Sequence, residues 1–481
     1  MNAAVIFRIL GTILMLFSFT HLMPLAVSII FNDGEHMVFI LSFLITFVIG
    51  LIIWVPVYHV SSELKTRDGF LITSLFWIVL GLFGAMPLLM NNTLSLSFTD
   101  AIFESISGLT TTGATVISGL DDLPKSLLYY RQQLQWLGGI GIIVIAVAIL
   151  PLLGIGGMQL YRAEPGPIKD SKLTPRITET ASWLFFMYAM LTAACAFCYW
   201  LAGMDAFNAI SHSFSTVAIG GFSTHDASLG HYQSPAIWMV ASVFMFIAAL
   251  NFALHYYTYS RRTVRHYFSD PESKFYFFYL LIACLVCIIS LQLLDFDDMD
   301  NYVFHAIFQV ISIATTTGFA TTDFSIWPAY LPFMLLFLSC IGGCGGSTGG
   351  GIKTIRIILM SKQGLRELRQ LVHPNAVIPI KLKGRTVPNN VLSAVWSFVA
   401  IYGLTFLVIL FMLQATGLDF LTAYSATIAT LNNLGPGLGS VAENYAGVSD
   451  PGKWVMCLSM LLGRLEIFTL LVLLTPTFWR R

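Results

Sequence analysis

A pattern of thirteen residues occurs four times along this chain and restricts its possible folds more than any other feature. Each copy begins with an alanine and ends twelve residues later with a glycine. The clearest copies are AIFESISGLTTTG (101–113) and AIFQVISIATTTG (306–318), and weaker copies occupy 209–221 and 423–435. The position six residues before the glycine holds serine in three copies and alanine in the fourth: Ser107, Ser215, Ser312 and Ala429. The chain is therefore expected to contain four equivalent structural units.

Each copy also carries a signal for the start of a helix. An aspartate lies just ahead of a short apolar run, where it is expected to be the N-cap; the four are Asp100, Asp205, Asp300 and Asp419. The run is shorter than the roughly 20 apolar residues that a helix needs to cross a bilayer. Each copy is therefore predicted to be a half-helix that enters the membrane and ends in a glycine-containing turn, inside protein or beside water.

Four such turns around one axis would present rings of carbonyl oxygens to a dehydrated cation. The C-terminal ends of the half-helices would direct partial negative charge to the same place. One glycine per turn supplies the backbone freedom that inward-pointing carbonyls need. The alternative is that four ordinary glycines end four packed helices, but this leaves the repeated flanking order unexplained.

The composition is that of a membrane protein. Only 10% of the residues are charged, against about 25% in soluble proteins, and 56% are hydrophobic. Stretches of more than 20 residues without Asp, Glu, Lys or Arg include 132–161, 180–204, 227–260 and 386–418. Lysine and arginine gather before the first copy, between successive copies and at the C-terminus; those between the first two copies are Arg162, Lys169, Lys172 and Arg176. These connections and both termini are therefore predicted to be cytoplasmic, with the glycine turns facing outward.

The predicted fold is an all-α, multi-pass membrane protein in which four tandem membrane–pore–membrane repeats, like those of a potassium channel, form a pseudo-fourfold arrangement. Two leading spans are predicted at 9–31 and 37–60. The spans that flank the half-helices are predicted at 70–92 and 132–158, 181–203 and 235–260, 275–294 and 328–360, and 388–414 and 454–478. The corresponding boundaries are 1–68 for the leading spans and 69–165, 166–265, 266–370 and 371–481 for the four repeats.

The second span of the third repeat contains an unusual glycine-rich segment, GGCGGSTGGG at 342–351. Each glycine weakens a helix by about 1 kcal/mol relative to alanine, so the span is expected to break here. A loop at this depth could occlude the pore below the filter; the alternative is close helix packing through small residues. A nucleotide-binding P-loop is excluded because Ile352 disrupts the required spacing before Lys353.

Few ionisable residues lie within the predicted spans. Arg464 and Glu466 lie in the middle of the last span and, being two residues apart, are expected to have different partners. Arg464 is predicted to face the pore or the glycine-rich loop, whose carbonyl oxygens suit its five donors. Glu104 is interpreted as bracing the filter from behind, with attraction of cations as the alternative. His212 and His305 are interpreted as hydrogen-bonded packing residues.

Residues 70–481 resemble the Trk/Ktr/HKT superfamily of cation transporters, which is built from four membrane–pore–membrane units with one filter glycine each. The two leading spans resemble the Trk branch, and the chain is most similar to the transmembrane subunits of bacterial Trk-type potassium uptake systems. The resemblance implies K⁺ contacts from the filter glycines and the two residues before each: Thr111, Thr112, Gly113, Ile219, Gly220, Gly221, Thr316, Thr317, Gly318, Asn433, Leu434 and Gly435. The fourth loop lacks threonine, so only approximate fourfold symmetry is expected.

The resemblance has further implications. It implies an intramembrane gate at Gly345, Gly346, Ser347, Thr348, Gly349 and Gly350, to which Arg464 is added as a gating residue. It implies a homodimer in the bacterial inner membrane that pairs with a cytosolic nucleotide-binding ring subunit of the RCK type. Potassium is expected as the transported ion, with no covalent cofactor and no nucleic-acid partner. In plant-type relatives, serine at the first filter glycine accompanies sodium transport, so Gly113 favours potassium.

Three functions compete at this point. The first is potassium uptake through a gated pore. The second is proton- or sodium-coupled symport with potassium, which requires exchangeable carboxyl groups at membrane depth, where only Glu104 and Glu466 are candidates; a weakly selective K⁺/Na⁺ pore is a variant of the first. The third is a membrane-embedded enzyme, and the sequence contains no H-E-x-x-H motif or paired intramembrane aspartates. No enzymatic activity is therefore predicted.

Overall fold

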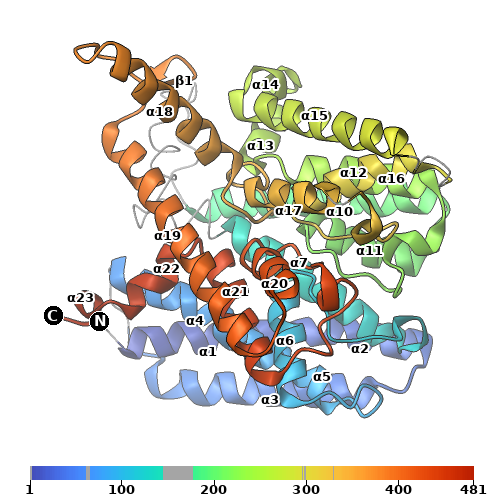
Figure 1. Cartoon of the computed structure of the whole chain (residues 1–481). Helices are drawn as coiled ribbons and strands as arrows, with labels where there is room; N and C mark the ends of the chain where they lie inside the picture. Colours follow the sequence, from blue (N-terminus) through green and yellow to red (C-terminus); the bar gives the residue numbers. More distant parts are fainter. Residues whose placement is uncertain are drawn as a thin grey trace.

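The computed structural model describes residues 3–60, 66–144, 177–294, 296, 300–328 and 330–480 (Figure 1). Within this part of the chain the fold is helical apart from one short hairpin. Six helices are long and apolar enough to cross a membrane, or up to eight if each of two bent pairs is one span. The all-α membrane fold is thereby confirmed. The end of the predicted span 132–158 and the basic connection from Arg162 to Arg176 lie outside the described residues.

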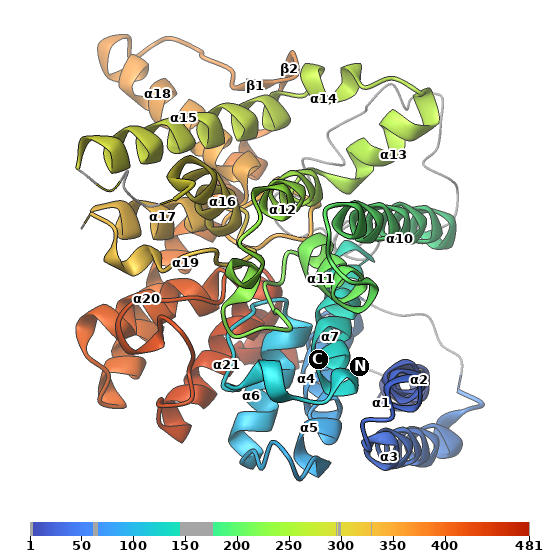
Figure 2. The same cartoon turned by 90° about the vertical axis from the view of Figure 1, so that its right-hand side faces the viewer.

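The leading spans form a pair of packed helices. The first is divided by a 3-10 turn, and the second is continuous up to Trp54: α1 (Ala3–Ser18), η1 (Phe19–His21), α2 (Leu22–Phe31), α3 (His36–Trp54) and η2 (Val55–Val57). Gly11 and Gly50 allow α1 and α3 to pack closely, because a Cβ at Gly11 would lie 2.8 Å from the Gly50 carbonyl oxygen. Figure 2 shows this pair at the edge of the molecule, beside the four repeats.

Four groups of helices follow in the predicted order. The first two are α4 (Thr66–Gly84), α5 (Met86–Met90), α6 (Phe98–Leu109), η3 (Leu120–Asp122) and α7 (Lys125–Val144), then α10 (Ile177–Leu201), α11 (Ala206–Ala218), η6 (Ser228–Tyr232), α12 (Pro235–Ala248) and α13 (Phe252–Arg261). The third is α14 (Arg265–Ser269), α15 (Pro271–Leu293), α16 (Tyr302–Ala314), η7 (Phe324–Ile326), α17 (Tyr330–Ile341) and α18 (Thr354–Val372). The fourth is α19 (Asn389–Ala415), α20 (Phe420–Leu431), η8 (Gly439–Val441), α21 (Asp450–Arg464), α22 (Phe468–Leu471), η9 (Val472–Leu474) and α23 (Pro476–Trp479). The groups surround a common centre (Figure 2).

The half-helices α6, α11, α16 and α20 begin in different ways. Asp205 and Asp419 are N-caps, accepting from the N–H groups of Asn208 at 3.2 Å and Thr422 at 3.1 Å. The same prediction is wrong for Asp100, because Ser97 caps α6 one turn earlier, and for Asp300, because α16 follows Asn301 without a side-chain cap. Asp100 instead binds Lys453 of α21 at 2.6 Å, which joins the first repeat to the fourth.

The second helix of a repeat breaks in more places than the sequence indicates. The glycine-rich segment interrupts the third repeat as expected, between α17 and α18. The second and fourth repeats break as well, with bends of 93° between α12 and α13 and 108° after α21. Asn251 caps α13 through its side chain, whereas Glu466 and Ile467 take positive φ angles of 52° and 57°. The helices α12, α17 and α21 thus end beside the glycine-rich loop, which lies below the half-helices.

The segment predicted to be cytoplasmic between the third and fourth repeats is ordered. Residues 364–371 belong to the end of α18, which is followed by strands β1 (Lys381–Leu382) and β2 (Arg385–Thr386). Lys381 pairs with Thr386 in antiparallel register. Apolar residues of α18, the hairpin and α19 form one small core at this end of the molecule (Figure 1).

Candidate ion filter and gate

All four half-helices end in the same backbone motif. The residue before each filter glycine donates its N–H to the carbonyl six positions before that glycine, in a Schellman-type turn. The pairs are Thr112–Ser107 at 2.8 Å, Gly220–Ser215 at 2.9 Å, Thr317–Ser312 at 2.8 Å and Leu434–Ala429 at 2.7 Å. The acceptor is a main-chain oxygen, so alanine serves at 429 as well as serine does elsewhere.

The sign of φ alternates in the same way in all four loops. The residue two before each glycine has positive φ, at 52° for Thr111, 55° for Ile219, 69° for Thr316 and 54° for Asn433. The glycines follow with φ of 82°, 79°, 84° and 99°, at Gly113, Gly221, Gly318 and Gly435. When the sign of φ alternates, successive carbonyl groups can point to the same side of an extended segment. In a β-strand, by contrast, successive carbonyl groups point to opposite sides. Three consecutive residues per loop can therefore face one axis.

The four glycines close a ring. A Cβ placed on Gly113 would collide with the carbonyl oxygen of Gly220, one on Gly221 with that of Thr317, and one on Gly318 with that of Leu434. A Cβ on Gly435 would lie 2.7 Å from the carbonyl oxygen of Thr112. Each loop thus touches the next in the order 1–2–3–4–1. The structure brings together all twelve residues expected in the filter, and no side chain larger than hydrogen fits at the glycine positions.

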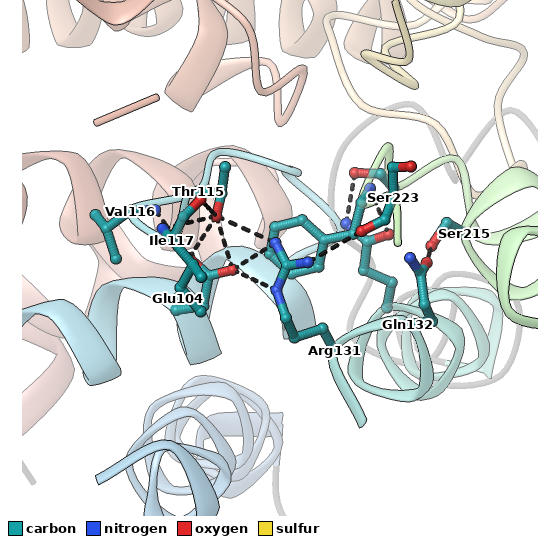
Figure 3. A network of polar contacts seen from close by, with 11 residues as sticks. Glu104, Thr115, Val116, Ile117, Arg131, Gln132, Ser215 and Ser223 are labelled. Carbon is teal, nitrogen blue, oxygen red and sulfur yellow. Dashed lines mark hydrogen bonds and ion pairs between the residues drawn. The ribbon is translucent and has the colours of Figure 1, made fainter. Parts of the chain in front are cut away.

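Buried polar side chains hold the first loop from behind (Figure 3). Glu104 is fully buried and accepts from the Thr115 hydroxyl and the Val116 N–H, each at 3.0 Å. It forms an ion pair with Arg131 of α7 at 2.8 Å, and Arg131 also donates to the Ser223 carbonyl oxygen of the second loop at 3.0 Å. Of the two interpretations of Glu104, the geometry supports bracing of the filter.

Side chains of α7 that the sequence analysis missed hold the second loop. Gln135 donates to the Gly220 carbonyl at 2.5 Å and accepts from the Phe222 N–H at 3.0 Å. Gln132 accepts a hydrogen bond from the Ser215 hydroxyl. The sequence feature that could have identified these side chains is the polar cluster RQQLQ at 131–135, which is unusual in a membrane span. Because the span is expected to start at 132, Arg131 falls outside it. The helix begins at Lys125, so Arg131 lies in its interior.

The fourth loop replaces threonine hydroxyls with amide and phenol groups. Asn433 donates to the Thr112 hydroxyl of the first loop at 2.9 Å and to the Met460 carbonyl at 3.0 Å. Tyr445 donates to the Gly435 carbonyl oxygen at 2.6 Å. The backbone ring therefore stays closed where the sequence departs from the repeat.

The glycine-rich loop lies directly against the residues that lead into the filter. Residues 342–349 are all buried. The Gly350 N–H donates to the Thr316 hydroxyl at 2.7 Å, and the Thr348 hydroxyl donates to the Val217 carbonyl at 3.1 Å. A Cβ on Gly350 would collide with the Asn432 carbonyl oxygen. The loop thus contacts the ends of three half-helices, those of the second, third and fourth repeats.

Two arginines and a lysine surround this loop. Arg464, only 3% exposed, donates to the carbonyl oxygens of Thr348 at 3.0 Å and Gly138 at 3.2 Å. Glu466 pairs instead with Arg356, so the expectation that Arg464 and Glu466 have different partners is confirmed. Lys353 donates to the Gly349 carbonyl. Three positive charges therefore gather at one buried loop together with two carboxylates: Glu466 pairs with Arg356, and Glu272 accepts from the Gly345 N–H at 2.7 Å.

The comparison with known proteins agrees with this geometry. Residues 35–480 match the family of cation transport proteins called TrkH. The chain belongs to the TrkH family. It is 54% identical to the Trk system potassium uptake protein TrkH of Halomonas elongata and 51% identical to that of Escherichia coli K12, in both cases over the full length of both chains. The crystal structure of the potassium transporter TrkH from Vibrio parahaemolyticus matches with a TM-score of 0.93 and 52% identity over 100% of both chains.

Membership of the TrkH family confirms the resemblance drawn from the repeats. The family is one of cation transporters and not a class of enzymes. The two histidines of the half-helices are hydrogen-bonded packing residues, as expected. His212 contacts the Asn208 carbonyl at 3.0 Å and the Ser223 hydroxyl at 2.9 Å, and His305 contacts the Thr321 hydroxyl at 2.7 Å.

The Glu104–Arg131 pair gives a first prediction for this TrkH-family chain. Arg131→Met should lower the free energy of unfolding by about 3–5 kcal/mol, because it leaves the Glu104 carboxylate buried without its partner. Thermal unfolding in detergent measures the change. Arg366→Met is the matched control, since Arg366 pairs with Glu367, which is 56% exposed. The double variant Glu104→Leu/Arg131→Met should recover part of the loss. An equal change in the free energy of unfolding for Arg131→Met and Arg366→Met would contradict the bracing role.

Proposed function

We propose that this chain takes up potassium by permeation through a filter formed by residues 111–113, 219–221, 316–318 and 433–435. The observation that carries the proposal is the closed ring of the four filter glycines, with the same alternation of φ in each loop. Carbonyl oxygens arranged in this way replace the hydration shell of a monovalent cation. The relatives from Halomonas elongata and Escherichia coli are named potassium uptake proteins, which supports K⁺ as the transported ion.

The gate is proposed to be residues 345–350 together with Arg464. Residues 345–349 are buried, the loop contacts three half-helix ends, and Arg464 donates to its Thr348 carbonyl. Among the described residues no carboxylate forms an ion pair with Arg464, and its charge adds an electrostatic barrier to a cation that leaves the filter on this side. Conduction therefore requires the loop to move, and the six consecutive small residues make such movement possible.

Permeation is favoured over symport by the state of the two candidate carboxylates. Glu104 pairs with Arg131 and Glu466 with Arg356, and both arginines are buried. Neither carboxylate is therefore a free group that takes up and releases protons at membrane depth.

The membrane location, orientation and protein partners of the chain are proposed from its exposed apolar residues, its charge distribution and its resemblance to the Trk branch. Exposed apolar side chains along α15 and α19, such as Phe278, Ile282, Leu404 and Phe411, suit contact with lipid. Both termini and the α18 hairpin segment are assigned to the cytoplasm of a bacterial inner membrane by the distribution of lysine and arginine. A homodimer and a cytosolic nucleotide-binding ring subunit are proposed from the resemblance to the Trk branch.

Rubidium flux into liposomes that contain only this chain tests the proposal. Uptake should be competed by K⁺ more strongly than by Na⁺ and should follow the K⁺ gradient. A reversal potential that shifts with pH at constant K⁺ would show proton coupling and contradict simple permeation. Liposomes without protein give the background rate.

A further inference from the structure

Three side chains of the kinds that bind transition metals gather beside the filter loops. Asp121 follows the first filter loop, and His225 and His231 follow the second. One ligand atom from each lies within 4.8 Å of the other two, and this is the one such group among the residues that the structure describes. Nothing in the proposed permeation mechanism uses these residues.

The three side chains are close enough to share one ion. His225 Nδ1 is hydrogen-bonded to Asp121 Oδ1, and His231 Nδ1 lies 4.0 Å from the same oxygen. The two imidazole rings stack with 3.7 Å between centroids and 5° between planes. The side chains of Asp121 and His231 are 47% and 46% exposed, so an ion from solution can reach them and His231 can turn toward it.

The chemistry of the group suits a divalent transition ion better than K⁺, Ca²⁺ or Mg²⁺, because two of its three ligands are imidazole nitrogens. A neutral imidazole offers one ring-nitrogen lone pair to a metal, and a ligand atom from each of the two histidines lies within reach of one ion. We propose that Asp121, His225 and His231 bind one Zn²⁺ per chain, with the ion replacing the proton between His225 and Asp121.

The backbone around the group is already held in place. The Leu120 N–H donates to the Asp226 carboxylate at 3.0 Å, which joins the first loop to the second. The His225 N–H donates to the Ser223 hydroxyl at 3.1 Å. Tyr232 packs edge-on against both imidazoles, with centroid distances of 5.5 Å to His225 and 5.2 Å to His231. Binding therefore requires reorientation of side chains and little movement of the backbone.

The position of the group gives the ion a consequence for transport. His225 follows Gly221 by four residues, so it lies within about 14 Å of the filter along the chain. Zn²⁺ would place two positive charges beside the outer side of the filter and fix the first loop against the second. This effect rests on the proposed function: bound Zn²⁺ lowers the rate at which K⁺ reaches the filter.

Binding is tested without any transport. Zn²⁺ titrated into the purified full chain in detergent should bind with a stoichiometry of one and release protons to a weak buffer at neutral pH. His231→Ala and Asp121→Asn should each weaken binding at least tenfold, whereas His36→Ala, which removes an exposed histidine at the start of α3, should not change it. Absence of stoichiometric binding, or equal binding by all three variants, overturns the site. Unchanged thermal unfolding without Zn²⁺ verifies that each variant is folded.

The flux assay tests the consequence separately. Zn²⁺ added to one side of rubidium-loaded liposomes, with chelator on the other, should slow flux severalfold in the original chain but not in His231→Ala. Binding without an effect on flux confirms the ion site and refutes its control of K⁺ access. Failure of the chain to carry rubidium at all refutes the proposed function and leaves the binding result standing.

Discussion

Gly113→Ser is expected to reduce the preference for potassium over sodium by about tenfold or more, which corresponds to a change of roughly 1.4 kcal/mol in relative ion stabilisation. Gly113 has φ of 82°, a conformation that a residue with a Cβ rarely adopts. Its Cβ would also collide with the Gly220 carbonyl oxygen of the next loop. The displaced carbonyl no longer fits the ion that the ring selects. Competition of rubidium flux by K⁺ and Na⁺ measures the change.

The same loop offers a matched control for this experiment. Gly119 also has positive φ, at 73°, but a Cβ there would meet nothing within 4 Å. Gly119→Ser therefore introduces similar backbone strain without crowding the ring, and its ion preference should stay unchanged. If Gly113→Ser keeps the original preference at normal protein levels, these loops are not the filter.

Arg464→Ala is expected to raise the steady-state flux of potassium severalfold without changing the ratio of potassium to sodium. The substitution removes the hydrogen bond to the Thr348 carbonyl, and bonds from a charged donor contribute about 1.5–3 kcal/mol each. It also removes one of the positive charges beneath the filter. No carboxylate pairs with Arg464 among the residues that the structure describes, so truncation strands no buried anion. Flux per folded protein is the quantity to measure.

Two further variants separate the effect of the hydrogen bond from Arg464 to the Thr348 carbonyl, the anchor of the loop, from the effect of the positive charge. Arg464→Lys keeps the charge but loses the geometry of the guanidinium, and Arg464→Met removes the charge but keeps much of the volume. High flux in both identifies the anchor as dominant, whereas high flux in the methionine variant alone identifies the charge. Lower flux than in the original chain for all three substitutions, at equal protein levels, would refute the gating role and indicate a residue that only supports the helix.

Local rules account for what the sequence predicted well. The repeat of an alanine twelve residues before a glycine describes a half-helix and its turn, and both are short-range features of the backbone. The glycine run had to break its span because glycine disfavours helix wherever it occurs. Even the change at Ala429 is local, since the hydrogen bond repeated in all four loops uses a main-chain carbonyl.

The missed features depend on partners that are far apart in the chain. Arg131 binds Glu104 from another helix, and Gln135 binds the carbonyl of Gly220 from another repeat. Glu466 meets Arg356 across 110 residues. The breaks after α12 and α21 are only weakly marked in the sequence: no glycine or proline stands at the first, and the single Gly463 stands beside the second. Both lie where these helices meet the glycine-rich loop.

The sequence by itself determined a membrane-embedded helical chain, four half-helices with one glycine turn each, and a break in the third repeat. These follow from hydrophobicity, helix ends and glycine content, which act within about twenty residues. Only the tertiary structure decided that the four turns close a ring, that Arg464 holds the loop below it, and that Asp121 meets two histidines beside it. Packing decides such contacts, because a buried polar group takes whichever partner the fold brings within hydrogen-bonding distance.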